Sequence, residues 1–129
     1  MMQDTIASAL SNILNAEKIG RSFCIVKPFS KMLKELLTIM NEKGYLGSFE
    51  LIDDGRGRMI KVNLIGKVNK CGVVKPRFSV KKDEYEKFEK RYLPAKGFGM
   101  LIVSTSKGIM THTDAFEKKL GGKLIAYVY

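Results

Sequence analysis

The stretch STSKGIMTHTDA, residues 104–115, contains the residue types that are best able to do chemistry in this chain. Residues 104–107, STSK, fit the S-x-x-K pattern, in which a lysine activates a serine nucleophile. Enzymes with this pattern also carry S-D-N and K-T-G motifs on a far larger scaffold, and this sequence has neither motif. His112 precedes Asp114, which is not the Ser-acid-His order of the α/β-hydrolases. We therefore expect no catalytic residue, no enzyme activity and no small-molecule substrate, and we keep a small Ser/Lys hydrolase as the alternative.

Metal and cofactor sites are not expected, because the residue types that form them are scattered along the sequence. His112 is the single histidine, and Cys24 and Cys71 lack the C-x-x-C spacing of a zinc site or a redox pair. We interpret His112 as a helix-capping or surface residue and both cysteines as reduced thiols. The glycines of DDGRGR, residues 53–58, fit a hairpin turn better than a phosphate-binding loop.

The hydroxyl groups of the same stretch are suited to binding a nucleic acid. Ser104, Thr105 and Ser106 follow an apolar run, and short hydroxyls in such a position can bond phosphate, a ribose 2′-OH or a base edge. Gly108 has no Cβ and permits the close approach of a sugar, and Lys107 can contact a phosphate. The alternative is an ordinary turn in which Ser and Thr bond their own backbone.

The charge of the chain favours a polyanionic partner. Lys and Arg outnumber Asp and Glu by 23 to 13, a net charge of +10. Residues 1–65 carry nine basic and seven acidic side chains (net +2), and residues 66–129 carry fourteen and six (net +8). A nucleic acid should therefore bind mostly to the second half. The candidate contacts there are Lys67, Lys70, Lys75 and Arg77.

A membrane partner is not expected, because no apolar run approaches the roughly 20 residues of a membrane span. The opening residues also lack the charged and long apolar regions of a signal peptide. The predicted location is the cytoplasm.

The first half of the sequence predicts an α-β-α-β-β module. Apolar residues recur at helical spacing between Asp4, a predicted N-cap, and Gly20. A strand is expected over residues 22–27, and a second helix is expected between its predicted N-cap, Ser30, and Gly44. The runs LGSFELID and MIKVNLIG alternate in and out around the turn DDGRG, which predicts a hairpin.

From Gly66 onward the sequence predicts a mostly β module with short helices. The runs FGMLIVS and KLIAYVY have the length of strands, and GIMT can add a third strand. Thr111 or Thr113 can cap a small helix that runs to Lys119. The predicted fold class is α+β, with two small packed modules at residues 1–65 and 66–129.

A charged helix is expected over residues 83–93, where Pro94 ends it. Tyr85, Phe88 and Tyr92 recur at spacings of three and four, and we interpret them as packing residues more than as base-stacking residues.

Several stretches of the sequence also resemble a known protein family. GFGMLIVSTSKGIMTHTDA and GGKLIAYVY resemble the C-terminal signature of the eighth protein of the small ribosomal subunit, and PFSK at 28–31 resembles its strand-to-helix junction. NKCGVVKPRF and KFEKRYLPAKGFG are similar to its archaeal and eukaryotic branch. The resemblance implies a two-domain α/β protein that binds a helical element in the central domain of 16S-type rRNA, promotes subunit assembly and lies next to other small-subunit proteins.

The resemblance also implies particular contacts with RNA. Ser104, Thr105, Ser106 and Gly108 would enter a minor groove around unpaired bases, with Lys107 at a variable position. Ser30 and Lys31 would be the contact from the N-terminal domain.

Two further expectations follow from the family. Bacterial relatives repress the translation of a message that mimics the rRNA site, so a regulator that binds messenger RNA is the alternative function. Many relatives carry a basic residue near the sequence TDAF, residues 113–116, and this chain does not. We expect Phe116 to pack against the final strand instead.

Overall fold

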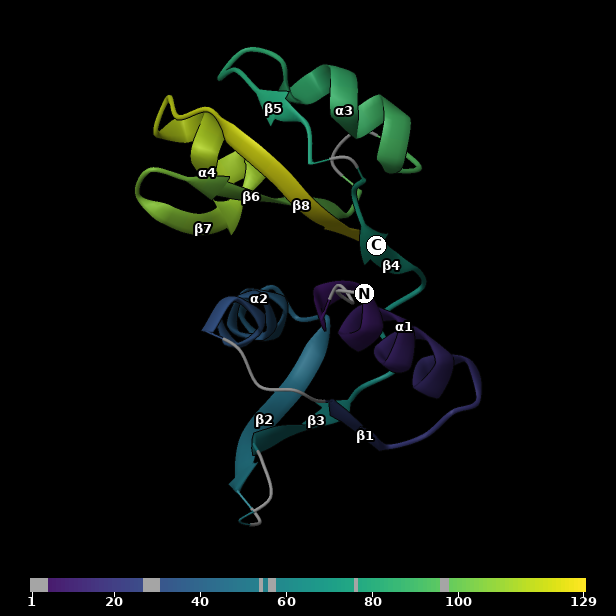
Figure 1. Ribbon diagram of the computed structural model, residues 1–129. Helices are drawn as coiled ribbons and strands as arrows, with labels where there is room; N and C mark the ends of the chain where they lie inside the picture. Colours follow the sequence, from purple (N-terminus) through teal and green to yellow (C-terminus); the bar gives the residue numbers. More distant parts are fainter. Residues whose placement is uncertain (1–4, 27–30, 54, 56–57, 76, 96–97) are drawn as a thin grey trace. The chain divides into compact units, whose positions relative to one another are not determined.

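The computed structural model describes residues 5–26, 31–53, 55, 58–75, 77–95 and 98–129 (Figure 1). The chain divides into two compact units, Met1–Lys70 and Cys71–Tyr129. The module boundary expected between residues 65 and 66 stays a prediction. The predicted helix caps Asp4 and Ser30 lie outside the described residues.

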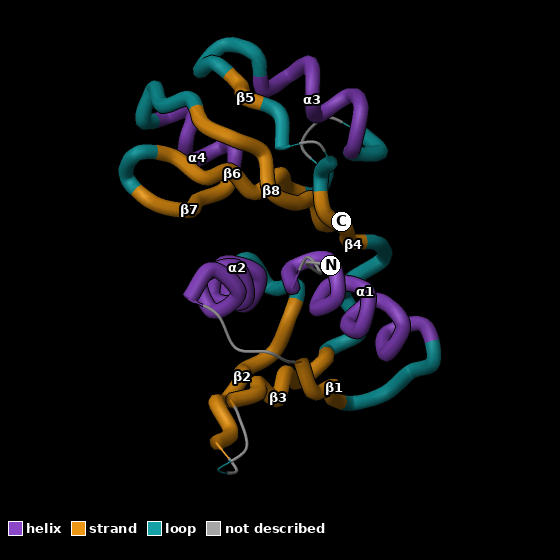
Figure 2. The backbone as a smooth tube through the Cα atoms, in the orientation of Figure 1, coloured by secondary structure: helices purple, strands orange, loops and turns teal. Residues whose placement is uncertain are grey.

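The first unit contains two helices and a three-stranded antiparallel sheet. Its elements are α1 (Thr5–Lys18), β1 (Phe23–Val26), α2 (Lys31–Glu42), β2 (Leu46–Asp53) and β3 (Arg58–Leu64). The predicted α-β-α-β-β order is therefore confirmed. The strands lie in the order β1-β3-β2, and both helices pack on one face of the sheet (Figure 2).

The core of the first unit lies between the helices and that face of the sheet. Alternate residues of β3 are buried, as expected for a strand with one covered face. The buried residues of α2 are the four that the sequence predicts, Leu33, Leu36, Leu37 and Met40. Burying each such side chain contributes about 1.5–3 kcal/mol, so the apolar stripe of α2 fixes which face of the helix meets the sheet.

β2 and β3 form the predicted hairpin, and Asp53 and Gly55 are the described residues of the DDGRG segment between them. The N–H of Gly55 donates to Oδ1 of Asp53 at 3.1 Å, and Asp53 pairs with Arg58 across the two strands. Gly55 has a φ of +84°, a conformation that favours glycine.

The second unit is built on a five-stranded antiparallel sheet, in which β8 (Gly122–Val128) is the central strand. β8 pairs with β6 (Met100–Thr105) on one side, and β6 pairs with β7 (Gly108–Thr111). On its other side β8 pairs with two short strands, β4 (Cys71–Val73) and β5 (Ser79–Val80). The two helices are α3 (Tyr85–Tyr92) and α4 (His112–Glu117). The predicted α+β fold class, with a mostly β second part, is confirmed.

The aromatic residues of α3 serve the core of the second unit. Tyr85 and Phe88 are buried, and the Tyr85 hydroxyl donates to the carbonyl of Leu120 at 2.8 Å. The ring of Tyr92 stacks on that of Tyr127, with centroids 5.7 Å apart. The prediction that these residues pack is confirmed.

The small helix α4 begins as predicted. The Thr111 hydroxyl accepts a hydrogen bond from the N–H of Asp114 at 3.3 Å, so Thr111 is the N-cap. The helix ends at Glu117, two residues before the expected Lys119.

Candidate nucleic-acid interface

The STSKG segment forms the tip of the β6–β7 hairpin (Figure 1). Ser106 and Lys107 make the turn, and Thr105 pairs with Gly108 directly below it. Gly108 has a φ of +112°, which a residue with a Cβ adopts only with strain. The tip is therefore a short turn on two paired strands rather than a long loop.

The hydroxyl of Thr105 holds this turn together. Its oxygen accepts a hydrogen bond from the N–H of Lys107 at 3.1 Å and donates to the carbonyl of Gly108 at 2.8 Å. For Thr105, the alternative interpretation of a hydroxyl that bonds its own backbone is therefore correct. Its predicted contact with RNA stays a prediction.

The hydroxyls of Ser104 and Ser106 behave differently from that of Thr105. Ser104 is half-buried and Ser106 is exposed. In the described part of the chain, neither serine side chain has a hydrogen-bond partner. Each can therefore donate to and accept from an external group.

A row of polar side chains crosses the sheet beside the hairpin. Ser104 of β6 lies opposite Lys123 of β8, and Lys123 lies opposite Ser79 of β5. Residues directly opposite in neighbouring strands point to the same face, with Cβ atoms about 4.5–5.5 Å apart. The sheet thus presents a lysine between two hydroxyls, and both Lys123 and Ser79 are exposed.

Ser79 and Lys123 were not predicted from the sequence as contacts with RNA. The run KLIAYVY offered a usable signal, because Lys123 is a charged residue at the start of an otherwise mostly apolar strand. The signal was insufficient because only strand pairing brings Lys123 next to Ser104.

The other residues that are predicted to contact RNA are divided between the two units. Lys75 and Arg77 are exposed in the second unit, in the segment between β4 and β5. Lys31 is exposed at the start of α2, and Lys67 and Lys70 are exposed after β3, so all three belong to the first unit.

Arg91 is a further cation that the sequence did not single out. Its guanidinium carbon lies 5.0 Å from the ring centroid of Phe78 and 5.7 Å from that of Tyr92. Phe78 in turn packs against the buried Phe88, with centroids 5.5 Å apart. Phe78 therefore supports a surface arginine and belongs to the edge of the core.

His112 is buried, at 4% exposure, so the expectation of a surface or capping residue is wrong. Its Nδ1 accepts a hydrogen bond from the N–H of Leu101 at 3.0 Å, and its Nε2 lies 2.8 Å from Oε1 of Glu89. Because Nδ1 is the acceptor, the proton is on Nε2 and the ring is neutral. Both nitrogens are thus occupied within the fold, which disfavours a role for His112 as the base of a serine nucleophile.

Phe116 is 60% exposed, so the expectation that it packs against the final strand is wrong. The preceding residue, Ala115, is fully buried and occupies the core-facing position of α4. Because successive helical residues are about 100° apart, Phe116 is turned away from that position.

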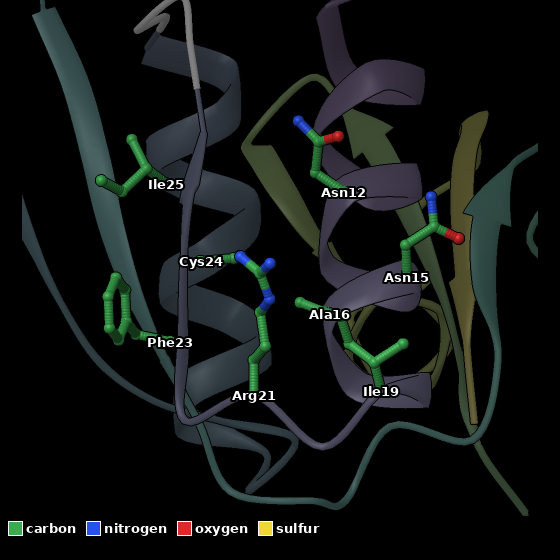
Figure 3. A pocket seen from close by; sticks show the side chains of 8 residues that line it. All are labelled: Asn12, Asn15, Ala16, Ile19, Arg21, Phe23, Cys24 and Ile25. Atoms are coloured by element: carbon green, nitrogen blue, oxygen red, sulfur yellow. The ribbon is translucent and has the colours of Figure 1, made fainter.

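A cavity of about 460 Å³ lies between α1 and β1 in the first unit (Figure 3). Asn12 and Asn15 of α1 and Arg21 before β1 are polar groups at its wall, and no described lining residue is acidic. Cys24 lies beside it as a free thiol, and burial, with a smaller effect of Glu17, raises its pKa to about 11. This cavity was not predicted from the sequence.

Both cysteines are free and buried, as predicted. Among the described residues, no three His, Cys, Asp or Glu side chains are close enough to hold a metal ion. No described helix combines the length and the apolar character needed to cross a membrane.

Comparison with known protein families gives a match over almost the whole chain. The model of the family described as ribosomal protein S8 matches residues 4–129. The matched region contains both structural units from their first described residue onward, including the β6–β7 hairpin. The chain therefore belongs to the ribosomal protein S8 family, a family of structural ribosomal proteins that bind rRNA and are not enzymes.

Proposed function

We propose that the chain is a primary rRNA-binding protein of the small ribosomal subunit. It recognises an irregular helix in the central domain of 16S-type rRNA and promotes assembly of the subunit. The observation that carries this proposal is the row Ser104–Lys123–Ser79 beside the tip Ser106-Lys107, where hydroxyls and lysines share one end of a paired sheet.

The arrangement suits the minor groove of an RNA helix. The major groove of A-form RNA is deep and narrow, so side chains reach base edges and 2′-hydroxyls mostly through the wide, shallow minor groove. Short serine side chains on a paired hairpin fit against such a surface without a large loss of side-chain entropy. Ser104 and Ser106 make the specific contacts, and Gly108 leaves room for the sugar-phosphate backbone.

The basic side chains supply affinity that does not depend on sequence. Lys107, Lys75 and Arg77 contact phosphates in the second unit, together with Lys123. Each contact releases counterions, so the logarithm of the binding constant falls by roughly 0.7–0.9 per phosphate contact for each tenfold rise in salt. Ser30, Lys31, Lys67 and Lys70 provide a weaker contact from the first part of the chain.

The resemblance to the archaeal and eukaryotic branch supports a place in a cytoplasmic ribosome of that type. The alternative function is that of a regulator that binds messenger RNA away from the ribosome. Co-sedimentation distinguishes this alternative from a ribosomal protein. A ribosomal protein co-sediments with small subunits in high salt, whereas a free-standing regulator does not.

A footprint on complete small-subunit rRNA tests the proposal. The purified chain is bound to the RNA at moderate ionic strength, and protection from hydroxyl radicals and base-specific reagents is mapped. We expect one protected irregular helix in the central domain. Protection that is absent, or spread evenly over the RNA, would show that the proposed recognition is wrong.

A further inference from the structure

A groove of about 300 Å³ lies between α3 and α4 in the second unit. Glu86 and Glu89 line it from α3, and Phe116 and Glu117 line it from α4. No lysine or arginine is among the described residues that line the groove. The groove therefore combines negative charge with an exposed aromatic ring.

This concentration of negative charge is unusual for the unit that contains it. Residues 71–129 hold six acidic side chains against twelve basic ones, and three of those six line this one groove. Carboxylates at this density repel the phosphates of RNA. The groove thus differs in charge from the polar row and the basic residues assigned to rRNA.

Glu89 places a poorly compensated charge in the groove. Its side chain is only 15% exposed, and its Oε1 lies 2.8 Å from Nε2 of His112, whose Nδ1 accepts the N–H of Leu101. A largely buried carboxylate without a cationic partner is costly. A cationic side chain that enters the groove would reduce this cost.

Phe116 adds an apolar contact at the same place. Its side chain is 60% exposed although α4 has a buried face available at Ala115. Exposed aromatic rings next to charged groups are frequent anchors of protein interfaces and also attract cations to their faces.

A single metal ion does not fit as the occupant. Among the described residues, no group of three His, Cys, Asp or Glu side chains is arranged to hold a metal ion. The carboxylates are instead distributed along two helices, which suits several positive charges spaced along a peptide.

We propose that the α3–α4 groove docks a basic segment of a neighbouring ribosomal protein. An apolar side chain of that segment packs on Phe116, and flanking Lys or Arg side chains pair with Glu89 and Glu117. The inference rests on the proposed place of the chain in the small subunit, and it assigns this face to protein while the β6–β7 end of the sheet binds RNA.

Photocrosslinking in assembled subunits identifies the occupant. The full chain carrying p-benzoylphenylalanine at position 116 is incorporated into reconstituted small subunits and irradiated. The matched control carries the same group at Phe98, the other exposed aromatic residue described in the second unit, at 52% exposure. We expect a crosslink from position 116 alone, to one Lys- and Arg-rich protein segment. A crosslink to rRNA or to a second copy of the chain, or no crosslink at position 116, would overturn the proposal.

A binding assay on the isolated full chain tests the same groove without the ribosome. The probe is a fluorescent peptide of alternating arginine and leucine, and the control peptide has glutamate in place of arginine. Phe116→Ser and Glu117→Lys should each weaken binding of the arginine peptide by roughly tenfold. Affinity for the rRNA fragment should not fall in either variant.

The two proposals fail in different ways. If the variants bind the arginine peptide as tightly as the unmodified chain does, or if Phe116→Ser lowers rRNA affinity, the groove assignment is wrong. If the unmodified chain does not bind the rRNA fragment but binds the arginine peptide through Phe116, the proposed RNA function fails and the groove assignment stands.

Discussion

Gly122 of β8 lies so close to Ser104 of β6 that a Cβ atom at position 122 would overlap the carbonyl oxygen of Ser104 and stand 2.9 Å from its carbonyl carbon. Cβ atoms in proteins essentially never come this close to another heavy atom. A side chain at position 122 would therefore force β6 or β8 to move. The position of the Ser104 hydroxyl therefore depends on a glycine eighteen residues further along the sequence.

Gly122→Ala should lower both stability and rRNA affinity. Forcing the strands apart costs about 1–3 kcal/mol of unfolding free energy and displaces Ser104 from the row that it forms with Lys123. Urea unfolding followed by circular dichroism and filter binding to the rRNA fragment measure the two effects. Gly55→Ala is the control, because it strains a turn with a φ of +84° in the first unit and contacts nothing within 4 Å. Equal losses of rRNA affinity in the two variants would contradict this role of Gly122.

The hydroxyls of Ser104 and Ser106 should contribute to rRNA binding, whereas that of Thr105 should contribute to stability. Ser104→Ala and Ser106→Ala should leave the unfolding free energy within about 0.5 kcal/mol of its original value, because no described internal hydrogen bond is lost. Each should weaken rRNA binding by about 1–3 kcal/mol if it leaves an RNA group unpaired.

Thr105→Val, unlike the two serine variants, should lower the unfolding free energy. It removes the bonds to Lys107 and Gly108, so the unfolding free energy should fall by about 1–2 kcal/mol. Hydrogen exchange at the amide of Lys107, measured by NMR, should accelerate in this variant and not in Ser106→Ala. An unchanged exchange rate would show that the Thr105 hydroxyl does not order the tip.

Lys123→Ala and Lys75→Ala should each reduce the salt dependence of rRNA binding by about one phosphate contact. Their preference for the specific RNA over a random helix should change little, because phosphate contacts carry no sequence information. The measurement is the binding constant for the rRNA fragment at several salt concentrations from low to moderate, which gives the slope of its logarithm against the logarithm of the salt concentration. Lys34→Ala, on the exposed side of α2, is the matched control and should leave the slope unchanged. A loss of discrimination between RNAs in Lys123→Ala would instead place Lys123 on a base edge.

His112→Ala should destabilise the second unit by about 2–5 kcal/mol. The change leaves the buried N–H of Leu101 without its acceptor and the half-buried carboxylate of Glu89 without its donor. His112→Asn can keep an acceptor near the N–H of Leu101, so we expect this variant to lose less unfolding free energy than His112→Ala. NMR correlations within the imidazole ring should report a proton on Nε2 alone at neutral pH. A proton on Nδ1 would show that the bond from Leu101 is absent.

Cys24 should react with iodoacetamide only at high pH. Burial, with a smaller contribution from Glu17, raises the pKa of the thiol from 9.0 to about 11, so the reactive thiolate is scarce at neutral pH. The rate of alkylation should rise with a midpoint near pH 11 in the folded chain and near pH 9 in urea.

The same pKa shift affects stability. Because the folded thiol holds its proton where the unfolded thiol has lost it, the contribution of Cys24 to stability is complete below pH 9 and is lost as the pH rises toward 11. Cys24→Ala should therefore show a smaller loss of unfolding free energy over this pH range. A loss as large as that of the unmodified chain would contradict the assignment to Cys24.

Local patterns in the sequence determined most of the elements and the chemical character of the partner. The spacing of Leu33, Leu36, Leu37 and Met40 was enough to predict α2, because helical periodicity places these residues on one face. The hairpin of β2 and β3, the cap at Thr111 and the hydroxyl-rich tip are also local, since each depends on a short stretch of sequence. The excess of positive charge in residues 66–129 is a property of composition alone, and it favours a polyanionic partner whatever the fold.

Only the tertiary structure decided which of these residues act together. The row Ser104–Lys123–Ser79 depends on the register of three strands that are distant in sequence, and a shift of one residue would turn Lys123 to the other face. The burial of His112 depends on Glu89 and Leu101, which come from α3 and β6, and nothing in the sequence around His112 identifies these partners. Packing likewise put Ala115 rather than Phe116 into the core and left an aromatic ring beside three carboxylates. Composition and periodicity act between near neighbours, whereas strand register and buried hydrogen bonds are set by contacts that exist only once the chain has folded.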